Sequence, residues 1–177
     1  MTRRPGAMAV REPVAFHRPP RAARQFNTEV LVCGSRDRGD DGAPIAAAES
    51  LPSRLPADAR VRIVGQLDID DLLAVPAGAR VVIVDAAIGI RPGRIVELPL
   101  TGFIGRTDRL RPRSSHSLAF KEVIGLAELM RGHPLQGVIV AIGGRRFGLG
   151  DDLSEPVARA VPALVDSIVN AVDEGRG

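Results

Sequence analysis

Residues 30–42 read Val30-Leu31-Val32-Cys33-Gly34-Ser35-Arg36-Asp37-Arg38-Gly39-Asp40-Asp41-Gly42. The apolar run stops at Gly34, and two adjacent carboxylates follow just before a helical pattern that opens at Pro44. An apolar run, a glycine-punctuated turn and a helical pattern are typical of the first strand, loop and helix of an α/β domain. Because ligands bind beyond the carboxyl ends of the strands in such sheets, Asp40 and Asp41 stand where a site is expected.

The rest of the chain alternates strand and helix patterns. We predict strands over 29–33, 60–65, 80–85, 94–98 and 137–142, and helices over 43–55, 69–73, 117–131 and 154–173. The last helix has the clearest pattern, because its apolar residues recur at helical spacing and Ser154 is placed to cap its start. Short connections between parallel strands imply right-handed crossovers with helices on both faces. The sequence therefore predicts an α/β fold, a three-layer αβα sandwich around a mostly parallel, roughly five-stranded twisted sheet.

The first 26 residues differ in composition from the rest of the chain. They carry six arginines, one acid and four prolines, whereas the whole chain of 177 residues has a net charge of only +3. Such a segment has too little apolar surface to fold, so we expect a disordered basic extension over 1–26 and a single α/β domain over 27–177. Since the positive charge lies in the extension and the chain has no Trp or Tyr, base stacking on nucleic acid is not expected.

The chain contains one cysteine, Cys33, which lies inside the first predicted strand. A single cysteine cannot form an internal disulfide, which suits a reducing cytoplasm, and its apolar surroundings predict a core residue rather than a reactive thiol. No apolar run approaches the roughly 18 residues that a membrane helix needs. We expect a cytoplasmic monomer that binds neither a membrane nor nucleic acid.

Three polar residues are candidates for a common site. Asp41 follows the first strand and its loop, Asp85 ends an apolar strand, and His116 precedes a predicted helix. Each has a structural alternative: Asp40 or Asp41 can cap a helix, Asp85 can accept from loop amides, and His116 can be a loop or capping residue. Two carboxylates and one imidazole form a ligand set that suits nickel, zinc or cadmium and leaves coordination positions open.

Other catalytic and binding patterns are missing or incomplete. The H-E-x-x-H of zinc proteases is absent, and no G-x-S-x-G surrounds Ser35. The first loop also lacks the G-x-x-x-x-G-K-[ST] of a phosphate loop. The basic, glycine-rich segment over 143–148 is expected to be a solvated, mobile turn, with contact to an acidic substrate segment as the alternative.

The order of these motifs resembles that of the hydrogenase maturation endopeptidases. The family pattern, a strand followed by G-x-G-N-P-x-x-x-D-D/E-G, can be laid on residues 32–42 without a gap. Later blocks follow in the family's order: Val84-Asp85-Ala86-Ala87, then Ser115-His116, then Leu153-Ser154-Glu155-Pro156-Val157. The resemblance runs from about residue 29 to 172. The chain departs from the pattern at Val32 and Ser35, and Arg36-Asp37-Arg38 replaces an apolar, Pro-containing turn.

This resemblance implies an endopeptidase that removes the C-terminal extension of the nickel-iron hydrogenase large-subunit precursor after nickel insertion. It makes Asp41, Asp85 and His116 both the metal ligands and the catalytic residues, and leaves Asp40 as a structural partner. The implied metal is the nickel of the precursor, with zinc or cadmium able to substitute, and the implied partner is that precursor. The alternative is a catalytically weakened member that binds a hydrogenase subunit or another partner without cutting it, since the turn over 35–38 is altered.

Overall fold

The computed structural model describes residues 26–101 and 115–176, with the side chains of 115–119 and 176 left out. Five strands form one sheet in the order β2-β1-β3-β5-β4. Their bounds are β1 Thr28–Cys33, β2 Ala59–Gly65, β3 Arg80–Ala87, β4 Ile95–Pro99 and β5 Gly137–Gly143. All neighbouring pairs are parallel except β4 and β5, which are antiparallel. The mostly parallel sheet expected from the sequence is confirmed.

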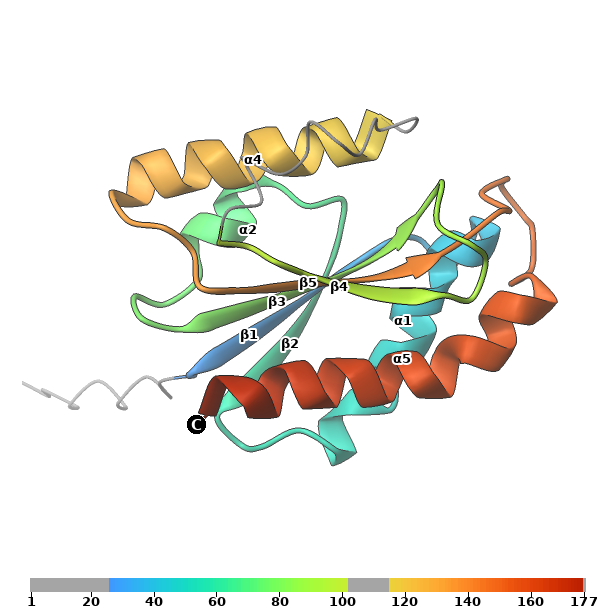
Figure 1. Ribbon diagram of the computed structural model, residues 1–177, viewed down its shortest axis with the longest axis horizontal. Coiled ribbons are helices and arrows are strands. Elements are labelled where there is room, and N and C mark those ends of the chain that lie inside the picture. The colour runs from blue at the N-terminus through green and yellow to red at the C-terminus, as the bar shows by residue number, and fades with distance from the viewer. Residues whose placement is uncertain (1–25, 102–114, 177) are drawn as a thin grey trace, which may run out of the picture.

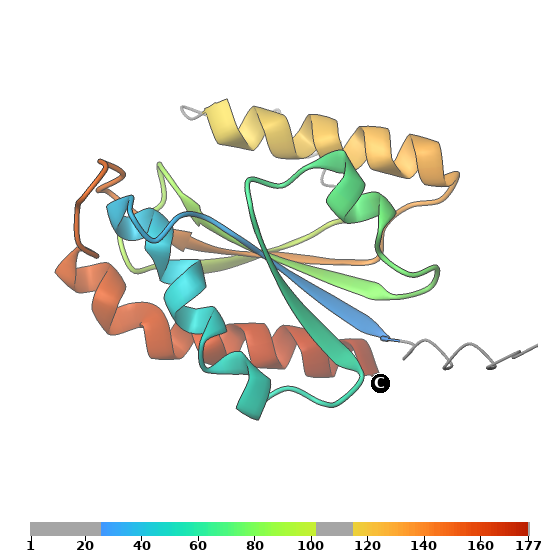
Figure 2. The ribbon, with the colours of Figure 1, turned by 180° about the vertical axis from the view of Figure 1, so that it is seen from behind.

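Helices cover both faces of this sheet (Figures 1 and 2). On one face lie α1 (Ala43–Ala48) and α5 (Glu155–Asp173), and on the other lie α2 (Ile69–Leu73) and α4 (Ser115–Arg131). Short 3-10 helices add η1 (Gly39–Gly42), η2 (Leu51–Ser53) and η4 (Glu174–Arg176). The chain therefore folds as the three-layer αβα sandwich that its alternating pattern predicts.

The three central strands explain why this sheet is apolar on both sides. Val30 and Val82 pack toward α1 and α5, whereas their neighbours Leu31 and Ile83 pack toward α2 and α4, and all four are fully buried. A strand covered on both faces needs apolar residues at successive positions, which is why β1, β3 and β5 read as continuous runs. The two cores hold the carboxyl ends of these strands at one common edge.

Two helix predictions need correction. The helix expected over 43–55 ends at Ala48, and a separate 3-10 turn follows at Leu51–Ser53. Pro52 has no N–H to continue the helical ladder, which accounts for the break. Ser154 does precede α5, but it makes no side-chain cap, because its hydroxyl donates instead to the carboxylate of Asp40.

The expected disordered extension falls almost wholly outside the described residues, which begin at Phe26. Phe26 itself belongs with the domain, since the guanidinium of Arg60 lies 5.0 Å from the centre of its ring. Among the described helices, none is long and apolar enough to cross a membrane.

Candidate active site

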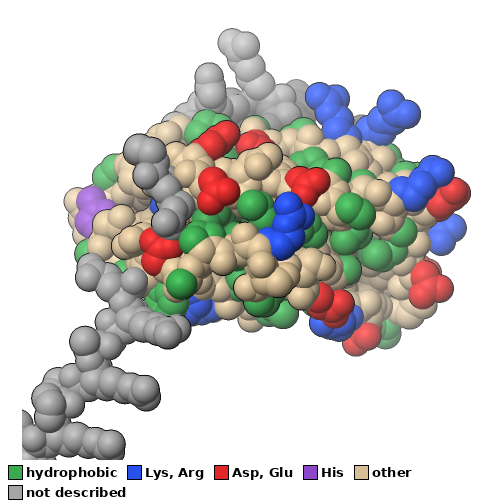
Figure 3. Space-filling view, turned by 90° about the horizontal axis from the view of Figure 1, so that it is seen from below, with side chains coloured by type: hydrophobic (Ala, Val, Ile, Leu, Met, Phe, Trp, Pro, Cys, Tyr) green, Lys and Arg blue, Asp and Glu red, His purple; other side chains and the backbone are tan. Residues whose placement is uncertain are grey.

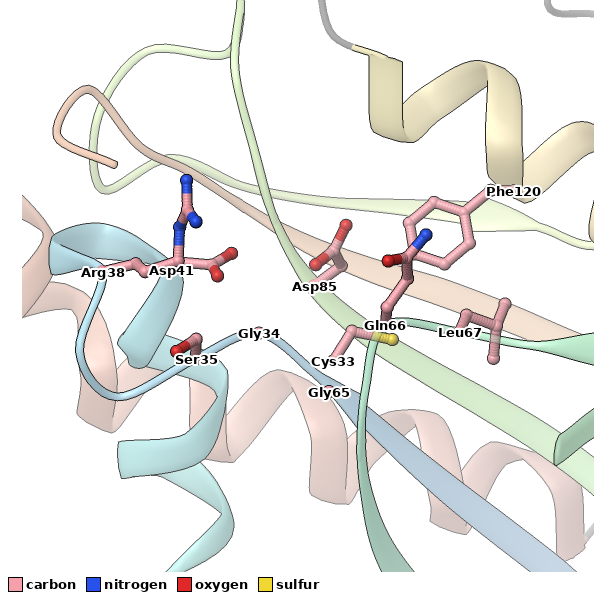
Figure 4. A pocket seen from close by; sticks show the side chains of 10 residues that line it. All are labelled: Cys33, Gly34, Ser35, Arg38, Asp41, Gly65, Gln66, Leu67, Asp85 and Phe120. Atoms are coloured by element: carbon pink, nitrogen blue, oxygen red, sulfur yellow. The ribbon is translucent and has the colours of Figure 1, made fainter. Parts of the chain in front are cut away.

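A pocket of about 400 Å³ opens at the carboxyl edge of the sheet (Figure 4). The segments that follow β1 and β2 form its walls, β3 contributes one side chain, and α4 contributes one ring. The lining residues are Cys33, Gly34, Ser35, Arg38, Asp41, Gly65, Gln66, Leu67, Asp85 and Phe120. This is the edge at which parallel α/β sheets bind their ligands.

Two of the predicted site residues meet in this pocket. Asp41 comes from η1 and Asp85 from β3, and Figure 4 shows their carboxylates turned toward one another. Gly34 makes this approach possible, because its φ is +113° and a Cβ atom there would lie 2.1 Å from the backbone oxygen of Asp41. Only glycine adopts this conformation without strain and leaves that space free, so the glycine after β1 sets the position of Asp41.

The pocket raises the pKa of Asp85 from 3.8 to about 7. Burial is the main cause, since it disfavours the charged carboxylate, and the negative charge of Asp41 adds to it. A hydrogen bond from the backbone N–H of Ala86 lowers the pKa but does not offset these effects. Asp85 therefore changes its protonation state near neutral pH, and a cation beside it would remove an electrostatic cost.

Asp40 has a different environment, although it adjoins Asp41 in the chain. It is fully buried, and its carboxylate accepts hydrogen bonds from the amides of Arg145 (2.8 Å), Arg146 (3.0 Å) and Ser154 (2.6 Å) and from the Ser154 hydroxyl (2.9 Å). Burial alone would raise the pKa of Asp40, but these four hydrogen bonds lower it below its ordinary value. The structural role expected for Asp40 is confirmed, because it ties η1 to the segment between β5 and α5.

The same contacts correct the expectation for the basic loop over 143–148. Arg145 and Arg146 are exposed, as a solvated turn requires, but their backbone amides are fixed by Asp40. The amide of Gly144 also donates to the carbonyl of Ala87 at 2.9 Å. The loop is therefore anchored to the two segments that carry the facing carboxylates.

Cys33 lines the pocket but is only 2% exposed. Burial raises the pKa of its thiol well above the ordinary value, and the charges of Asp85, Asp71 and Asp41 act in the same direction. The thiol is therefore protonated at neutral pH, which confirms a core residue and argues against a thiolate nucleophile.

His116, the third predicted ligand, is the second residue of α4, and its side chain lies outside the described part of the chain. Helix α4 covers the sheet face toward which Ile83 packs, and Asp85 lies two residues further along the same strand. Phe120, one helical turn after His116, lines the pocket. The backbone thus brings the start of α4 to the correct side of the sheet, and the role of His116 as a ligand stays a prediction.

Five lining residues were not singled out from the sequence as site residues: Arg38, Gly65, Gln66, Leu67 and Phe120. Arg38 lies in the first loop, within the motif itself. The other four come from segments without a motif, and only the topology of the sheet brings them to the pocket.

The donor set of the pocket suits a divalent cation in part. Across the side chains that the structure describes, no three His, Cys, Asp or Glu residues are arranged to hold a metal ion. Asp41 and Asp85 supply two facing carboxylates, and burial disfavours the charged form of Asp85 there. Carboxylate oxygens accept divalent cations, so these two residues fit one side of a metal site.

No protein-family profile matches the chain. Protein FrxA of Pyrococcus furiosus is 31% identical over 142 residues, which span 77% of this chain and 98% of that protein. The similar solved structures include two hydrogenase maturation proteases. One is the [NiFe] hydrogenase maturation protease HybD from Thermococcus kodakarensis, with TM-score 0.67 and 21% identity over 82% of this chain and 98% of that one. The other is the hydrogenase maturating endopeptidase HybD from E. coli, with TM-score 0.71 and 18% identity over 84% and 93%.

The sandwich has the same α/β fold as these structures. The identity to FrxA extends over nearly the whole of that protein, so the relationship goes beyond fold. The chain belongs to the hydrogenase maturation endopeptidase family.

Proposed function

We propose that this chain removes the C-terminal extension of a nickel-iron hydrogenase large-subunit precursor after nickel has been inserted. The observation that carries the proposal is the meeting of Asp41 and Asp85 in one pocket, where both carboxylates face the space that a peptide would enter. The similar solved structures are hydrogenase maturation proteases, which supports this type of substrate.

In this proposal the nickel is part of the substrate, and Asp41, Asp85 and His116 would contact it. A divalent cation held beside a peptide bond polarises the carbonyl group or lowers the pKa of a bound water. The chain's own carboxylates would fix the position of that cation relative to the peptide. Cleavage would then depend on nickel, because the empty precursor lacks the group that the carboxylates bind.

The two ends of the pocket would orient the peptide. Figure 4 shows Ser35 and Arg38 at the end near Asp41, where they offer hydrogen-bond donors to peptide carbonyl oxygens. Leu67 and Phe120 lie at the opposite end, beyond Asp85, and provide an apolar wall. Exclusion of water by this wall is consistent with the raised pKa of Asp85 and would strengthen the electrostatic interactions of a bound peptide. We place the reaction in the cytoplasm, where the single buried cysteine would stay reduced.

The test is incubation of the purified chain with nickel-loaded and nickel-free precursor, followed by intact-mass measurement. We expect loss of the C-terminal extension from the nickel-loaded precursor alone. No cleavage of either form would refute the peptidase role, and stable binding without cleavage would support the alternative of a catalytically weakened binder. Cleavage of both forms would refute the dependence on nickel and leave the peptidase role intact.

A further inference from the structure

We propose that a surface beside the pocket binds the folded body of the precursor while the pocket takes its C-terminal tail. This surface, the docking rim, is formed by Ile88, Arg91, Arg145, Arg146 and Leu149. The inference rests on the proposed function and adds to it the place where the rest of the substrate protein is held.

The docking rim combines two segments that lie side by side in both ribbon views (Figures 1 and 2). One is the turn between β3 and β4, and the other is the loop between β5 and α5. Backbone hydrogen bonds join them: the amide of Gly144 donates to the carbonyl of Ala87 at 2.9 Å, and that of Gly143 to the carbonyl of Arg94 at 2.8 Å. The backbones of the two segments are therefore held together.

The rim is also joined directly to the pocket. The amide of Asp40 donates to the carbonyl of Arg146 at 2.8 Å, and Asp40 adjoins the pocket residue Asp41. The amide of Gly150 donates to the carbonyl of Asp37 at 2.7 Å, in the loop that carries Arg38 into the pocket lining. A protein seated on the rim would thus have its tail beside the facing carboxylates.

The rim includes two exposed aliphatic side chains. Leu149 is 82% exposed and Ile88 is 51% exposed, and both lie on the segments that adjoin the pocket. A large aliphatic side chain in water gains free energy when a partner covers it. Single exposed aliphatics are ordinary, but two beside several arginines match the composition of protein interfaces.

The arginines of the rim differ from most others in the described part of the chain. Arg36 pairs with Glu49 at 2.6 Å and Arg54 with Asp166 at 2.7 Å, whereas no acid among the described residues pairs with Arg91, Arg145 or Arg146. Figure 3 shows basic side chains gathered at one end of the molecule, the end that holds the start of α5 and the loop before it.

Acids also lie at this end, but none of those that the structure describes forms an ion pair with an arginine of the rim. Asp37 and Asp152 are exposed, and the carboxylate of Asp151 accepts from the amide of Gly148 at 3.1 Å. The free guanidinium groups are suited to carboxylates, which they bind with two parallel hydrogen bonds. The partner surface that fits is therefore an apolar patch flanked by Asp or Glu, next to the tail that is cut.

The backbone of the rim is already fixed before any partner binds, because the carboxylate of Asp40 holds the amides of both Arg145 and Arg146. A surface that needs little ordering loses less entropy on association. The exposed apolar residues of α4, among them Leu129 and Met130, have no such connection to the pocket and provide a matched control.

The test compares binding of the nickel-loaded precursor by calorimetry, with the melting temperature of each variant as a check on folding. The rim variants are Leu149→Asp and the pair Arg145→Glu with Arg146→Glu. The controls are Leu129→Asp, at a leucine that is 77% exposed, and Arg159→Glu on α5. We expect the rim variants to raise Kd about tenfold or more and the controls to leave it within about twofold, since interface anchors carry most of the binding energy.

Several outcomes would overturn the docking rim. One is that the rim variants bind the precursor as tightly as the wild type does, and another is that rim and control variants lose the same amount of affinity. A third is that the rim variants change the oligomeric state of the free chain and leave precursor binding unchanged. If the wild-type chain cuts the precursor and the rim variants bind it normally, the rim is wrong and the proposed function stands. If the wild type binds through the rim but never cuts, the proposed function fails and the rim stands. Absence of any wild-type binding would overturn the rim directly.

Discussion

Replacement of Asp85 by Asn should stabilise the fold at alkaline pH and abolish processing. The pKa of Asp85 is about 7 in the pocket, against an ordinary value of 3.8. The folded protein therefore binds this proton more tightly than the unfolded chain does. Stability should be greatest below the ordinary pKa, fall as the pH rises toward 7, and stay reduced above it.

The size of the effect follows from the shift in pKa. A difference of about three pH units corresponds to about 4 kcal/mol of destabilisation above pH 7, at roughly 1.4 kcal/mol per unit. Asp85 is only partly buried by area, so solvent screening reduces this to about 2 kcal/mol. For a domain of this size, Asp85→Asn should raise the melting temperature by about 4 to 8 °C at pH 8.

The assay is thermal denaturation of the wild type and Asp85→Asn at pH 5 and pH 8. At pH 5 the wild-type carboxyl is protonated in the folded protein but mostly ionised in the unfolded chain, so the variant should already melt above the wild type, though by much less than at pH 8. Asn keeps the acceptor for the amide of Ala86 but loses the charge, so the fold should survive while precursor cleavage is lost. A lower melting temperature for the variant at pH 8, or an equal gain at both pH values, would refute the desolvation argument.

Three further substitutions test the account. Asp40→Asn should lower the melting temperature by about 6 to 12 °C at neutral pH, because the new NH₂ group would face a buried backbone N–H and about 3 kcal/mol of stability would be lost. Since the pKa of Asp40 is lowered in the folded protein, the stabilisation that its carboxylate provides should fade as the pH falls below 3.8. A variant as stable as the wild type at pH 7 would contradict this role. Gly34→Ala should cost about 3 kcal/mol or more in urea denaturation, since the left-handed backbone and the oxygen of Asp41 leave no room for a Cβ; a loss below about 1 kcal/mol would count against the close approach. Arg131→Ala should lower the free energy of unfolding by about 2 kcal/mol in the same assay, because Nη1 of Arg131 donates at 2.9 Å to the carbonyls of Leu72 and Val75 at the end of α2. A loss no larger than that for an exposed arginine would contradict this role.

Much of the fold could be predicted from local sequence patterns. The apolar runs of β1, β3 and β5 follow from their burial on both faces, and the stripe of α5 follows from one-sided packing, so each predicted span lies within two residues of the observed one. The exception is α1, which ends at Ala48, where the helix-breaking effect of Pro52 outweighs a run of good helix formers. The hydrogen bond from the Ser154 hydroxyl to Asp40 could not be predicted either, because the two residues are distant in the chain.

The site was only partly visible in the sequence. Asp41 and Asp85 could be predicted as site residues, because each lies at or just after the carboxyl end of a strand in a parallel sheet. The structural role predicted for Asp40 is confirmed by its four hydrogen bonds. Gln66 and Phe120 line the pocket only because β2 and α4 pack beside β1 and β3, and no local pattern marks them. The raised pKa of Asp85 likewise depends on burial and on the approach of Asp41.

The central claim is that the facing carboxylates form the centre of a peptidase. The most direct measurement is an intact-mass time course of nickel-loaded precursor with the wild type, Asp85→Asn and the control Leu129→Asp in parallel, each shown to be folded by its melting curve. The account predicts release of the C-terminal extension by the wild type and by Leu129→Asp, and none by Asp85→Asn. Cleavage by Asp85→Asn at the wild-type rate would contradict it.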